Sequence, residues 1–382
     1  MTGPLSGLRV VEFSAIGPVP FCGMLLADMG ADVLRLDRVN DPGLGIGKDQ
    51  RFDVLGRGKR SVAVDLKRPQ HVKLALDLAA RADILIEGYR PGVMERLGLG
   101  PEVCLARNPR LVFGRMSGWG QDGPLAMSAG HDINYVGLTG ALHAMGRPHD
   151  PPPPPLAIVG DFAGGAMMLI FGLLCALLEA QRSGKGQIVD AAIFDGVNLL
   201  MAPFHALLRA GRWLDRRGAN ALDGGAPWYD SYETADGKYL SVGAIEDKFY
   251  EEFLHVLQLD PASLPQRSDR EQWPALRTAF AAAIKRRKRD EWASLFAESD
   301  ACVAPVLSMG EVASHPHSVA RRSFVEANGF AQPAPTPRLS RTPASIGRKG
   351  PTPGEYGEAA LLDWGVTHNE IAAFRDSGGL CT

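Results

Sequence analysis

The sequence predicts an α/β protein with a Rossmann-like large domain and a smaller α+β domain. Short runs rich in branched apolar residues alternate with helix-like segments in the first third of the chain, which is typical of parallel βαβ units. Near Leu222 the pattern changes to a hairpin followed by amphipathic helices. A chain of 382 residues is also longer than one hydrophobic core usually supports, so two domains are expected.

Five apolar runs indicate the strands of the large domain: LRVVEF, ADVLRLDR, RSVAVDLK, ADILIEGYR and RLVFGRMSG. Between them, FCGMLLADMG and PQHVKLALDLAARA have the composition of helices. Ligands of such sheets bind outside the carboxyl ends of the strands, so the polar residues after these runs should meet at one edge. Those residues are Arg38, Lys67, Arg90 and Ser117.

The middle of the chain predicts a connection and a long helix. A proline run from Pro148 to Gly160 can form neither a helix nor a central strand, so we expect an extended surface connection. The apolar stretch from Gly164 to Ala180 is at the short limit for a membrane span and includes Glu179. We therefore expect a buried core helix that opens at Asp161.

The predicted domains are a large Rossmann-like domain at 1–221, a small α+β domain at 222–320, and a return segment at 321–382. Within the small domain, Asp236 and Gly237 provide a hairpin turn between two strands. The return segment contains a proline-rich stretch near 332–354 that is too long for an ordinary loop. We expect that stretch to cross the molecule or a partner before a terminal helix near Glu358 to Trp364.

Composition excludes several classes of function. The chain has 41 basic and 43 acidic residues, and this balance favours neither nucleic acid nor an anionic membrane as a partner. Its cysteines are scattered without a CxxC pair, which indicates reduced thiols and a cytoplasmic location. They are Cys22, Cys104, Cys175, Cys302 and Cys381. The N-terminal residues lack the pattern of a secretory signal.

Nucleotide-binding motifs are incomplete. The segment AIGPVPFCG after the first strand lacks the G-x-G-x-x-G that brings backbone against a pyrophosphate. The stretch GLGIGKD near Gly43 imitates a phosphate loop, but Pro42 replaces its first glycine and Asp49 its Ser or Thr. Neither motif supports a nucleotide-dependent enzyme.

Three segments carry acid–base candidates: His131 and Asp132 in AGHDINY, Asp161 in VGDFAGG, and Glu246 in SVGAIEDKF. Each also has a structural interpretation. Asp161 suits a helix N-cap, because its oxygen accepts unpaired backbone N–H groups. A glutamate after a strand is commonly a surface residue, and a loop histidine commonly a satisfied hydrogen-bonding group. The residue types alone leave both interpretations open.

These motifs, together with LDGGAP, resemble in sequence and order the α-methylacyl-CoA racemases of the family III (CaiB/BaiF) CoA-transferase superfamily. The resemblance extends from GLRVVEF through GRGKRSVAVDLK to DACVAPV and covers essentially the whole chain. It implies an intertwined homodimer with its active site between the large domain of one chain and the small domain of the other.

The resemblance also implies the reaction, which is epimerisation at C2 of 2-methylacyl-CoA thioesters through an enolate. His131 and Asp161 would be the paired acid and base, and Glu246 the partner of the histidine. Such a reaction needs one protonated and one ionised group on opposite faces of the carbon, and reference pKa values of ~6.5 and ~3.9 can be shifted to meet that need. We expect the helix start at Asp161, with Gly164 and Gly165, to offer N–H groups to the enolate.

The CoA part of the substrate is expected to contact strand-end residues and the GHDINY segment. No metal, flavin or nicotinamide is expected, because CoA belongs to the substrate. The implied contacts are Arg38, Val64, Asp65, Leu66, Lys67, Gly88, Tyr89, Arg90, Arg96, Gly130, Asp132, Ile133, Asn134 and Tyr135.

Two other functions remain open. A family III CoA transferase uses an aspartate at the position of Asp161 as a nucleophile, and so shares that residue. A catalytically idle acyl-CoA-binding protein would bind CoA without turnover. The additional pair of His131 and Glu246 favours epimerisation over transfer.

Overall fold

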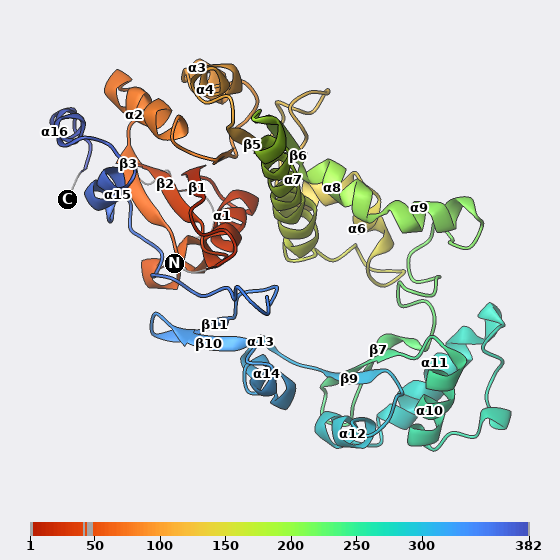
Figure 1. Ribbon diagram of the computed structural model, residues 1–382. Coiled ribbons are helices and arrows are strands. Elements are labelled where there is room, and N and C mark those ends of the chain that lie inside the picture. The colour runs from red at the N-terminus through yellow and green to blue at the C-terminus, as the bar shows by residue number, and fades with distance from the viewer. Residues whose placement is uncertain (1–2, 41–42, 44–48, 381–382) are drawn as a thin grey trace. The chain divides into compact units, whose positions relative to one another are not determined.

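The computed structural model describes residues 3–40, 43 and 49–380 (Figure 1). Cys381, Pro42 and most of the GLGIGKD stretch lie outside the described residues. The chain divides into two compact units, each described by itself below. The large unit contains Met1–Thr139, Pro155–Leu200 and Pro316–Thr382, and the small unit contains Gly140–Pro154 and Met201–His315.

These units differ from the predicted boundaries at 1–221, 222–320 and 321–382. Residues 201–221 group with the start of the proline-rich connection in the small unit, not with the large one. The reason is a set of hydrogen bonds: the Arg217 guanidinium donates to the carbonyls of His143, Arg147 and Asp150, each at 3.0 Å. The return segment belongs with the large unit from Pro316 onward.

The large unit contains a parallel six-stranded sheet with the order β3-β2-β1-β4-β5-β6. This is the doubly wound order of Rossmann folds, so the predicted fold class is confirmed. The five predicted strand runs form β1 to β5. The strands are β1 (Arg9–Phe13), β2 (Asp32–Arg38), β3 (Arg60–Val64), β4 (Ile84–Glu87), β5 (Val112–Ser117) and β6 (Ile188–Ala192).

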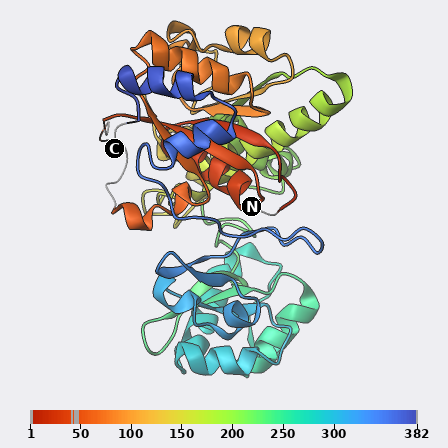
Figure 2. The same cartoon turned by 60° about the vertical axis from the view of Figure 1, so that its left-hand side comes forward.

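Helices cover both faces of this sheet (Figures 1 and 2). On one face a continuous apolar core includes Phe13, Leu36, Phe113 and Trp364. Its helices are α2 (Pro69–Ala79), α3 (Val93–Arg96), α4 (Pro101–Arg107), α15 (Gly357–Asp363) and α16 (His368–Asp376). The other face carries α1 (Pro18–Asp28) and α7 (Met168–Ser183). The predicted terminal helix near Glu358 is therefore α15, and α16 follows it.

The long central helix begins earlier than predicted. A π-helical segment, η3 (Ile158–Met167), precedes α7, so Asp161 lies in the first turn and is not the N-cap. The chain turns into this helix through left-handed backbone at Leu156 and Ala157, with φ of 57° and 60°. The residue types at 156 and 157 do not predict this left-handed turn, because non-glycine residues seldom adopt that conformation.

Gly164 and Gly165 serve packing between helices, whereas the sequence predicted that they leave the first turn open to the substrate. Both lie in the body of η3, so their N–H groups belong to the helix ladder. They are buried against α8 (Ile193–Leu200): a Cβ at Gly164 would stand 2.6 Å from Cγ2 of Val197, and one at Gly165 would stand 3.1 Å from Cγ1 of Ile193. Glycine is needed here for close approach of the two helices.

The apolar helix from Ile158 to Ser183 has one buried and one exposed face. Leu169, Leu173 and Leu177 are buried, whereas Phe171 and Leu178 are 69% and 56% exposed. Among the described residues this helix alone is long and apolar enough to cross a membrane, with a mean hydropathy of 2.0 and 39% of the apolar window buried. The core-helix prediction therefore holds for one face only.

The small unit is an α+β structure with the predicted hairpin. Strands β7 (Tyr229–Glu233) and β8 (Tyr239–Gly243) are antiparallel, and at their turn Thr234 N–H donates to the Lys238 carbonyl at 2.8 Å. A third strand, β9 (Val303–Val306), was not predicted. Three helices pack on this sheet around Trp228, Phe253 and Phe280: α10 (Asp247–Leu257), α11 (Trp273–Ile284) and α12 (Arg289–Phe296).

Shorter elements complete the described chain. In the large unit they are α5 (Asp132–Gly137), α14 (Pro316–Ala320), the hairpin of β10 (Phe324–Ala327) and β11 (Phe330–Pro333), and the 3₁₀ turns η1 (Gln50–Phe52) and η2 (Val54–Gly56). In the small unit they are α6 (Ala141–Ala144), α9 (Ala202–Arg209), α13 (Met309–Val312), η4 (Pro261–Ser263) and η5 (Arg270–Gln272).

After β11 the return segment runs back along the large unit in extended form. Ser345 N–H donates to the carbonyl of Asp28 at 3.1 Å, and Gly58 N–H donates to that of Arg348 at 2.8 Å. Farther on, Ser61 N–H donates to the Glu355 carbonyl at 3.1 Å. The predicted crossing is thus made on the large unit of the same chain, and intertwining with a second chain stays a prediction.

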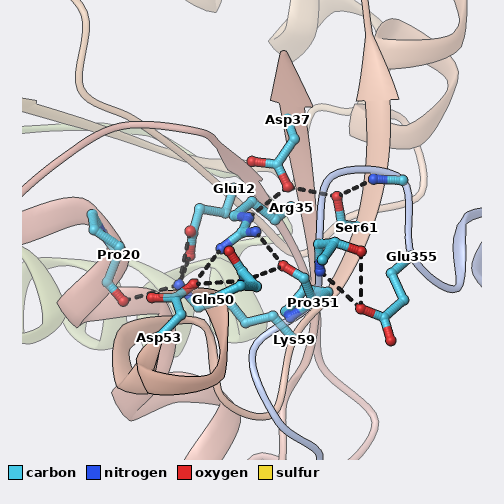
Figure 3. A network of polar contacts seen from close by, with 12 residues as sticks. Glu12, Pro20, Arg35, Asp37, Gln50, Asp53, Lys59, Ser61, Pro351 and Glu355 are labelled. Carbon is cyan, nitrogen blue, oxygen red and sulfur yellow. Dashed lines mark hydrogen bonds and ion pairs between the residues drawn. The ribbon is translucent and has the colours of Figure 1, made fainter. Parts of the chain in front are cut away.

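A buried ion pair joins Glu12 of β1 to Lys59, the residue before β3 (Figure 3). Lys59 donates to both carboxylate oxygens of Glu12, at 2.8 and 2.6 Å, and to the Pro20 carbonyl at 2.9 Å. Both side chains are fully buried. Burial raises the pKa of Glu12 and lowers the pKa of Lys59, while their attraction opposes both shifts. A Cβ at Gly23 of α1 would stand 1.7 Å from Glu12 Oε2, so the pair requires glycine there.

The return segment is anchored to this network through Arg35, whose guanidinium contacts Asp37 at 2.8 Å and the Pro351 carbonyl at 3.0 Å (Figure 3). Ser61 Oγ donates to Asp37 at 2.5 Å. Residues far apart in sequence are therefore joined through buried charge.

We predict that Lys59→Met destabilises the large unit by roughly 3–5 kcal/mol, because it leaves the carboxylate of Glu12 buried without a partner. The double change Glu12→Leu with Lys59→Met should recover much of that loss, since no isolated charge remains. Urea unfolding followed by circular dichroism measures both. Lys73→Met is the matched control: Lys73 contacts Asp77 at 2.6 Å but its side chain is 64% exposed, so about 1 kcal/mol or less is expected. Equal losses in the two single variants would contradict the prediction.

Candidate active site

Two cavities open beyond the carboxyl ends of the strands in the large unit. The first has a volume of about 420 Å³ and lies at the ends of β4 and β5. The second has a volume of about 610 Å³ and lies at the ends of β2 and β3. Tyr89 lines both cavities. They flank the point between β1 and β4 where the strand order reverses, which is where ligands bind in such sheets.

The structure brings the predicted strand-end residues to this edge. Arg38 and Lys67 line the second cavity, and Arg90 and Ser117 line the first. Of the expected CoA contacts, most line one of the two cavities: Arg38, Val64, Asp65, Leu66, Lys67 and Tyr89 in the second, and Gly88, Tyr89, Arg90, Gly130, Asn134 and Tyr135 in the first. Arg96, Asp132 and Ile133 line neither.

His131 is the N-cap of α5 and lines the first cavity. Its backbone N–H donates to Oδ1 of Asn134 at 3.0 Å, and Asn134 N–H donates to the His131 carbonyl at 2.8 Å. The helix start therefore fixes the backbone of the histidine and leaves its exposed side chain available. Asn134 acts as part of this cap.

Tyr135 forms a wall of the same cavity. Its hydroxyl donates to the Gly130 carbonyl, and its ring packs edge-on against Trp119 at 4.8 Å between centroids. A Cβ at Gly118 would stand 2.1 Å from the ring, so this close packing requires glycine. Burial, and then the charge of Asp161, raises the pKa of the Tyr135 phenol.

Asp161 lies beside the end of β1, because a Cβ at Gly17 would stand 2.7 Å from its Oδ2. Its backbone N–H donates to Oδ1 of Asp132 at 2.7 Å. Burial and, after it, the nearby charge of Asp132 raise the pKa of the Asp161 carboxyl to about 6, and His131 opposes the shift. Asp161 and His131 therefore interact within one unit.

Glu87 is a buried residue of this region that the sequence interpretation missed. It ends β4, and its Oε2 accepts the Tyr89 N–H at 2.7 Å. Its Oε1 accepts from Nε of Arg115 at 3.0 Å, and Arg115 also contacts Glu95 at 2.7 Å. Burial raises the pKa of Glu87 to about 7. The available signal was a carboxylate that directly follows the apolar run Ile84–Ile86 at the end of a strand.

The loop after β3 is held by the end of the chain. Asp65 N–H donates to Nδ1 of His71 at 2.8 Å, and Nε2 of His71 lies 3.1 Å from Ser377 Oγ. Gly378 lines the second cavity beside Arg68. The C-terminal residues thus help to shape the cavity that contains Arg38 and Lys67.

Glu246 belongs to the small unit, where it is the exposed N-cap of α10. Its pairing with His131 stays a prediction. The same unit has a cavity of about 720 Å³ formed partly by the LDGGAP loop. Arg277 holds that loop by donating to the carbonyls of Gly224 and Gly225 at 2.7 and 2.8 Å.

A family model for CoA-transferase family III matches residues 5–356. The chain belongs to this family. This chain is 43% identical to the curated alpha-methylacyl-CoA racemase of Mus musculus, over 369 residues, and to that of Homo sapiens, over 371 residues. Each match covers 96% of this chain and 95% of the relative. A succinyl-CoA–D-citramalate CoA-transferase from Chloroflexus aurantiacus is 31% identical, with 97% of this chain and 96% of the relative covered.

Solved structures agree with this assignment. A CAIB/BAIF family protein from Brucella suis has a TM-score of 0.81 at 26% identity, and the match covers 95% of this chain and 100% of that one. Rv3272 from M. tuberculosis in an orthorhombic form has a TM-score of 0.78 at 25% identity, with coverage of 94% and 99%.

Proposed function

We propose that this protein epimerises C2 of 2-methylacyl-CoA thioesters by 1,1-proton transfer. The observation that carries the proposal is the placement of His131 and Asp161 in adjoining turns, joined through Asp132. Identity of 43% to two alpha-methylacyl-CoA racemases along nearly the whole chain supports the same substrate class.

The chemistry needs two proton carriers on opposite faces of C2. One group removes the α-proton, the C–H electron pair moves onto the thioester carbonyl to form an enolate, and the other group returns a proton to the opposite face. A carboxyl with a pKa of about 6 is present in both protonation states near neutral pH. Asp161 can therefore act as base in one direction and as acid in the other.

The enolate oxygen needs donors other than Gly164 and Gly165. We propose that the backbone N–H groups at the start of α5 provide them, because Asp132 and Ile133 are its first two residues and first-turn N–H groups have no intrahelical acceptor. These groups follow His131 directly, so a carbonyl oxygen bound there would place C2 near the imidazole.

The second cavity suits the phosphates and adenine of CoA. Its walls carry the cations Arg38, Lys67 and Arg68. The Arg38 guanidinium lies over the ring of Tyr89, 5.9 Å from its centroid, and Tyr89 is the residue that lines both cavities. Each step of the proton transfer uses groups of the protein and substrate, so we propose that no metal or additional cofactor takes part.

We further propose a homodimer in which Glu246 of one chain pairs with His131 of the other. The exposed face of α7 carries Phe171 and Leu178, and Leu199 of α8 is 62% exposed. We expect a second chain to cover these large apolar side chains. A neighbouring carboxylate would orient the imidazole and favour its charged form.

CoA transfer is the second candidate, since a succinyl-CoA–D-citramalate CoA-transferase is a full-length relative. That chemistry requires Asp161 as an ionised nucleophile. With a pKa of about 6, most of Asp161 is ionised near neutral pH, so its pKa does not exclude CoA transfer. CoA transfer gives His131 no task, however, which is why we favour epimerisation. A protein that binds acyl-CoA without turnover would share the cavities but not the proton exchange.

We predict that the protein in D₂O exchanges the C2 hydrogen of a 2-methylacyl-CoA and interconverts its epimers without an acyl acceptor. Asp161→Asn and His131→Ala should each lower epimerisation by ~10² to 10⁴-fold, because each removes one acid–base group. Glu246→Gln should have a milder effect, because the imidazole remains. NMR of the C2 proton, with chiral analysis of the product, provides the measurement.

Each single variant is expected to retain some C2 exchange from the face whose base survives, since wash-out needs one deprotonation and inversion needs both faces. Transfer of CoA between carboxylates with no C2 exchange in the wild type would support the transferase. Binding without either reaction would support an idle acyl-CoA-binding protein. Wild-type epimerisation by His131→Ala would remove the histidine from the mechanism.

A second prediction concerns CoA recognition. Arg38→Ala and Arg90→Ala should raise KM more than they lower kcat, because phosphate contacts serve the ground and transition states alike. Added salt should weaken binding in parallel. Arg110→Ala is the control, since Arg110 precedes β5 at the opposite edge of the sheet. Loss of kcat at saturating substrate in folded Arg38→Ala would contradict the assigned CoA cavity.

A third prediction concerns assembly. Sedimentation at low micromolar concentration should give about twice the chain mass, and Phe171→Glu with Leu178→Glu should shift the protein toward monomer with loss of activity. Val103→Glu is the control, because Val103 is 43% exposed on α4, away from that apolar face. A stable and active wild-type monomer would refute the dimer.

A further inference from the structure

We propose that Asp132 is a positioning residue that joins the two proton carriers, and is not a CoA contact. The inference rests on the proposed function of His131 and Asp161. It differs from the expectation that Asp132 contacts CoA, and Asp132 lines neither cavity at the strand ends.

The first argument is connectivity. Asp132 follows His131 directly as the first residue of α5. Its Oδ1 accepts the backbone N–H of Asp161 at 2.7 Å, although the two aspartates are 29 residues apart in the chain. A single side chain therefore links the turn that carries the histidine to the turn that carries the carboxyl.

The second argument is the unmet donor of Asp161. The chain enters η3 at Ile158, so the N–H of Asp161 falls in the first turn and has no acceptor within the helix. The π-helical spacing begins only at the next residue, where Phe162 N–H donates to the Ala157 carbonyl at 3.2 Å. Asp132 provides an acceptor that the helix itself lacks.

The third argument is steric. A Cβ at Gly160 would stand 2.1 Å from Oδ1 of Asp132 and 2.9 Å from Cγ2 of Val136, so any other residue would displace the contact. On the far side, Gly17 leaves the room that the Asp161 carboxyl occupies. Glycine at position 160 thus makes room for the Asp132 contact, and glycine at position 17 makes room for the Asp161 carboxyl.

The charge of Asp132 has a consequence for the reaction. After burial, it is the main influence that raises the pKa of Asp161. The other ionisable groups near these carboxyls are His131, which lowers that pKa, and Tyr135 and Arg90, since the phenol of Tyr135 senses Asp161, Arg90 and Asp132 together. Removing the charge of Asp132 lowers the pKa of Asp161, because a like charge disfavours ionisation.

Asp132→Asn tests the charge while keeping an oxygen that can accept the Asp161 N–H. In the direction that uses ionised Asp161 as base, kcat/KM falls as the pH drops through the pKa of that carboxyl. We expect this limb to lie near pH 6 in the wild type and at lower pH in Asp132→Asn, with KM for the CoA thioester changed less than about twofold. Asp122→Asn, an exposed aspartate of a nearby loop, is the control and should leave the profile unchanged.

Asp132→Ala removes both the charge and the acceptor. We expect kcat for epimerisation to fall by about 10²-fold from misplacement of Asp161, and inversion to fall more than C2 exchange, because only one of the two faces loses its positioned group. Raised KM with unchanged kcat in both variants would make Asp132 a CoA contact and overturn the proposal. So would wild-type kcat and an unchanged pH profile in both variants.

A titration that needs no turnover separates this inference from the proposed function. Carboxyl ¹³C NMR of aspartate-labelled protein, assigned with Asp161→Asn, should give a midpoint of about 6 for Asp161 and a lower midpoint in Asp132→Asn. If the wild type lacked epimerase activity but showed this change, only the reaction assignment would fail. An unchanged midpoint would refute the coupling, and this result stands even if Asp132→Ala does not fold.

Discussion

The buried pair of Glu12 and Lys59 is the constraint on which the large unit depends. Glu12 is the fourth of the five residues of β1, a central strand of the sheet, and a buried charge there is tolerated only with a partner. Lys59 provides that partner and also donates a hydrogen bond to the Pro20 carbonyl in the first turn of α1. The pair thereby ties α1, β1 and the start of β3 together, and the contact of Gly23 with Glu12 fixes how closely α1 approaches.

The ion pair affects the candidate site because it fixes the position of α1. Gly17 stands between β1 and α1, so a fixed α1 gives a fixed place for the carboxyl of Asp161 beside it. The absence of a side chain at Gly164 also allows η3 to pack closely against α8. Close packing of backbone at glycine positions leaves little freedom for the segment that carries Asp161, which is the kind of rigid support that precise proton transfer requires.

The strands and the ligand edge could be predicted from the sequence because both follow from local rules: branched apolar runs form parallel strands, and their carboxyl ends share one edge. The start of the central helix could not, because an aspartate before glycines matches an N-cap and the left-handed backbone at Leu156 has no signature in residue type. The boundary at 201 depends on the bonds of Arg217 to a segment some 70 residues away. Glu87 escaped notice because its partner Arg115 comes from a different strand.

The protonation of Asp161 connects the fold to the choice between the two chemistries. An epimerase interconverts species of nearly equal free energy, so its two proton carriers serve both directions best when their affinities for the proton are similar. Burial and Asp132 bring the pKa of Asp161 to about 6, so both of its protonation states are populated near neutral pH. A carboxylate nucleophile uses the ionised form alone, whereas an epimerase also needs the protonated form to return a proton to the enolate. The like charge of Asp132 therefore contributes a protonated fraction of Asp161 that only epimerisation uses.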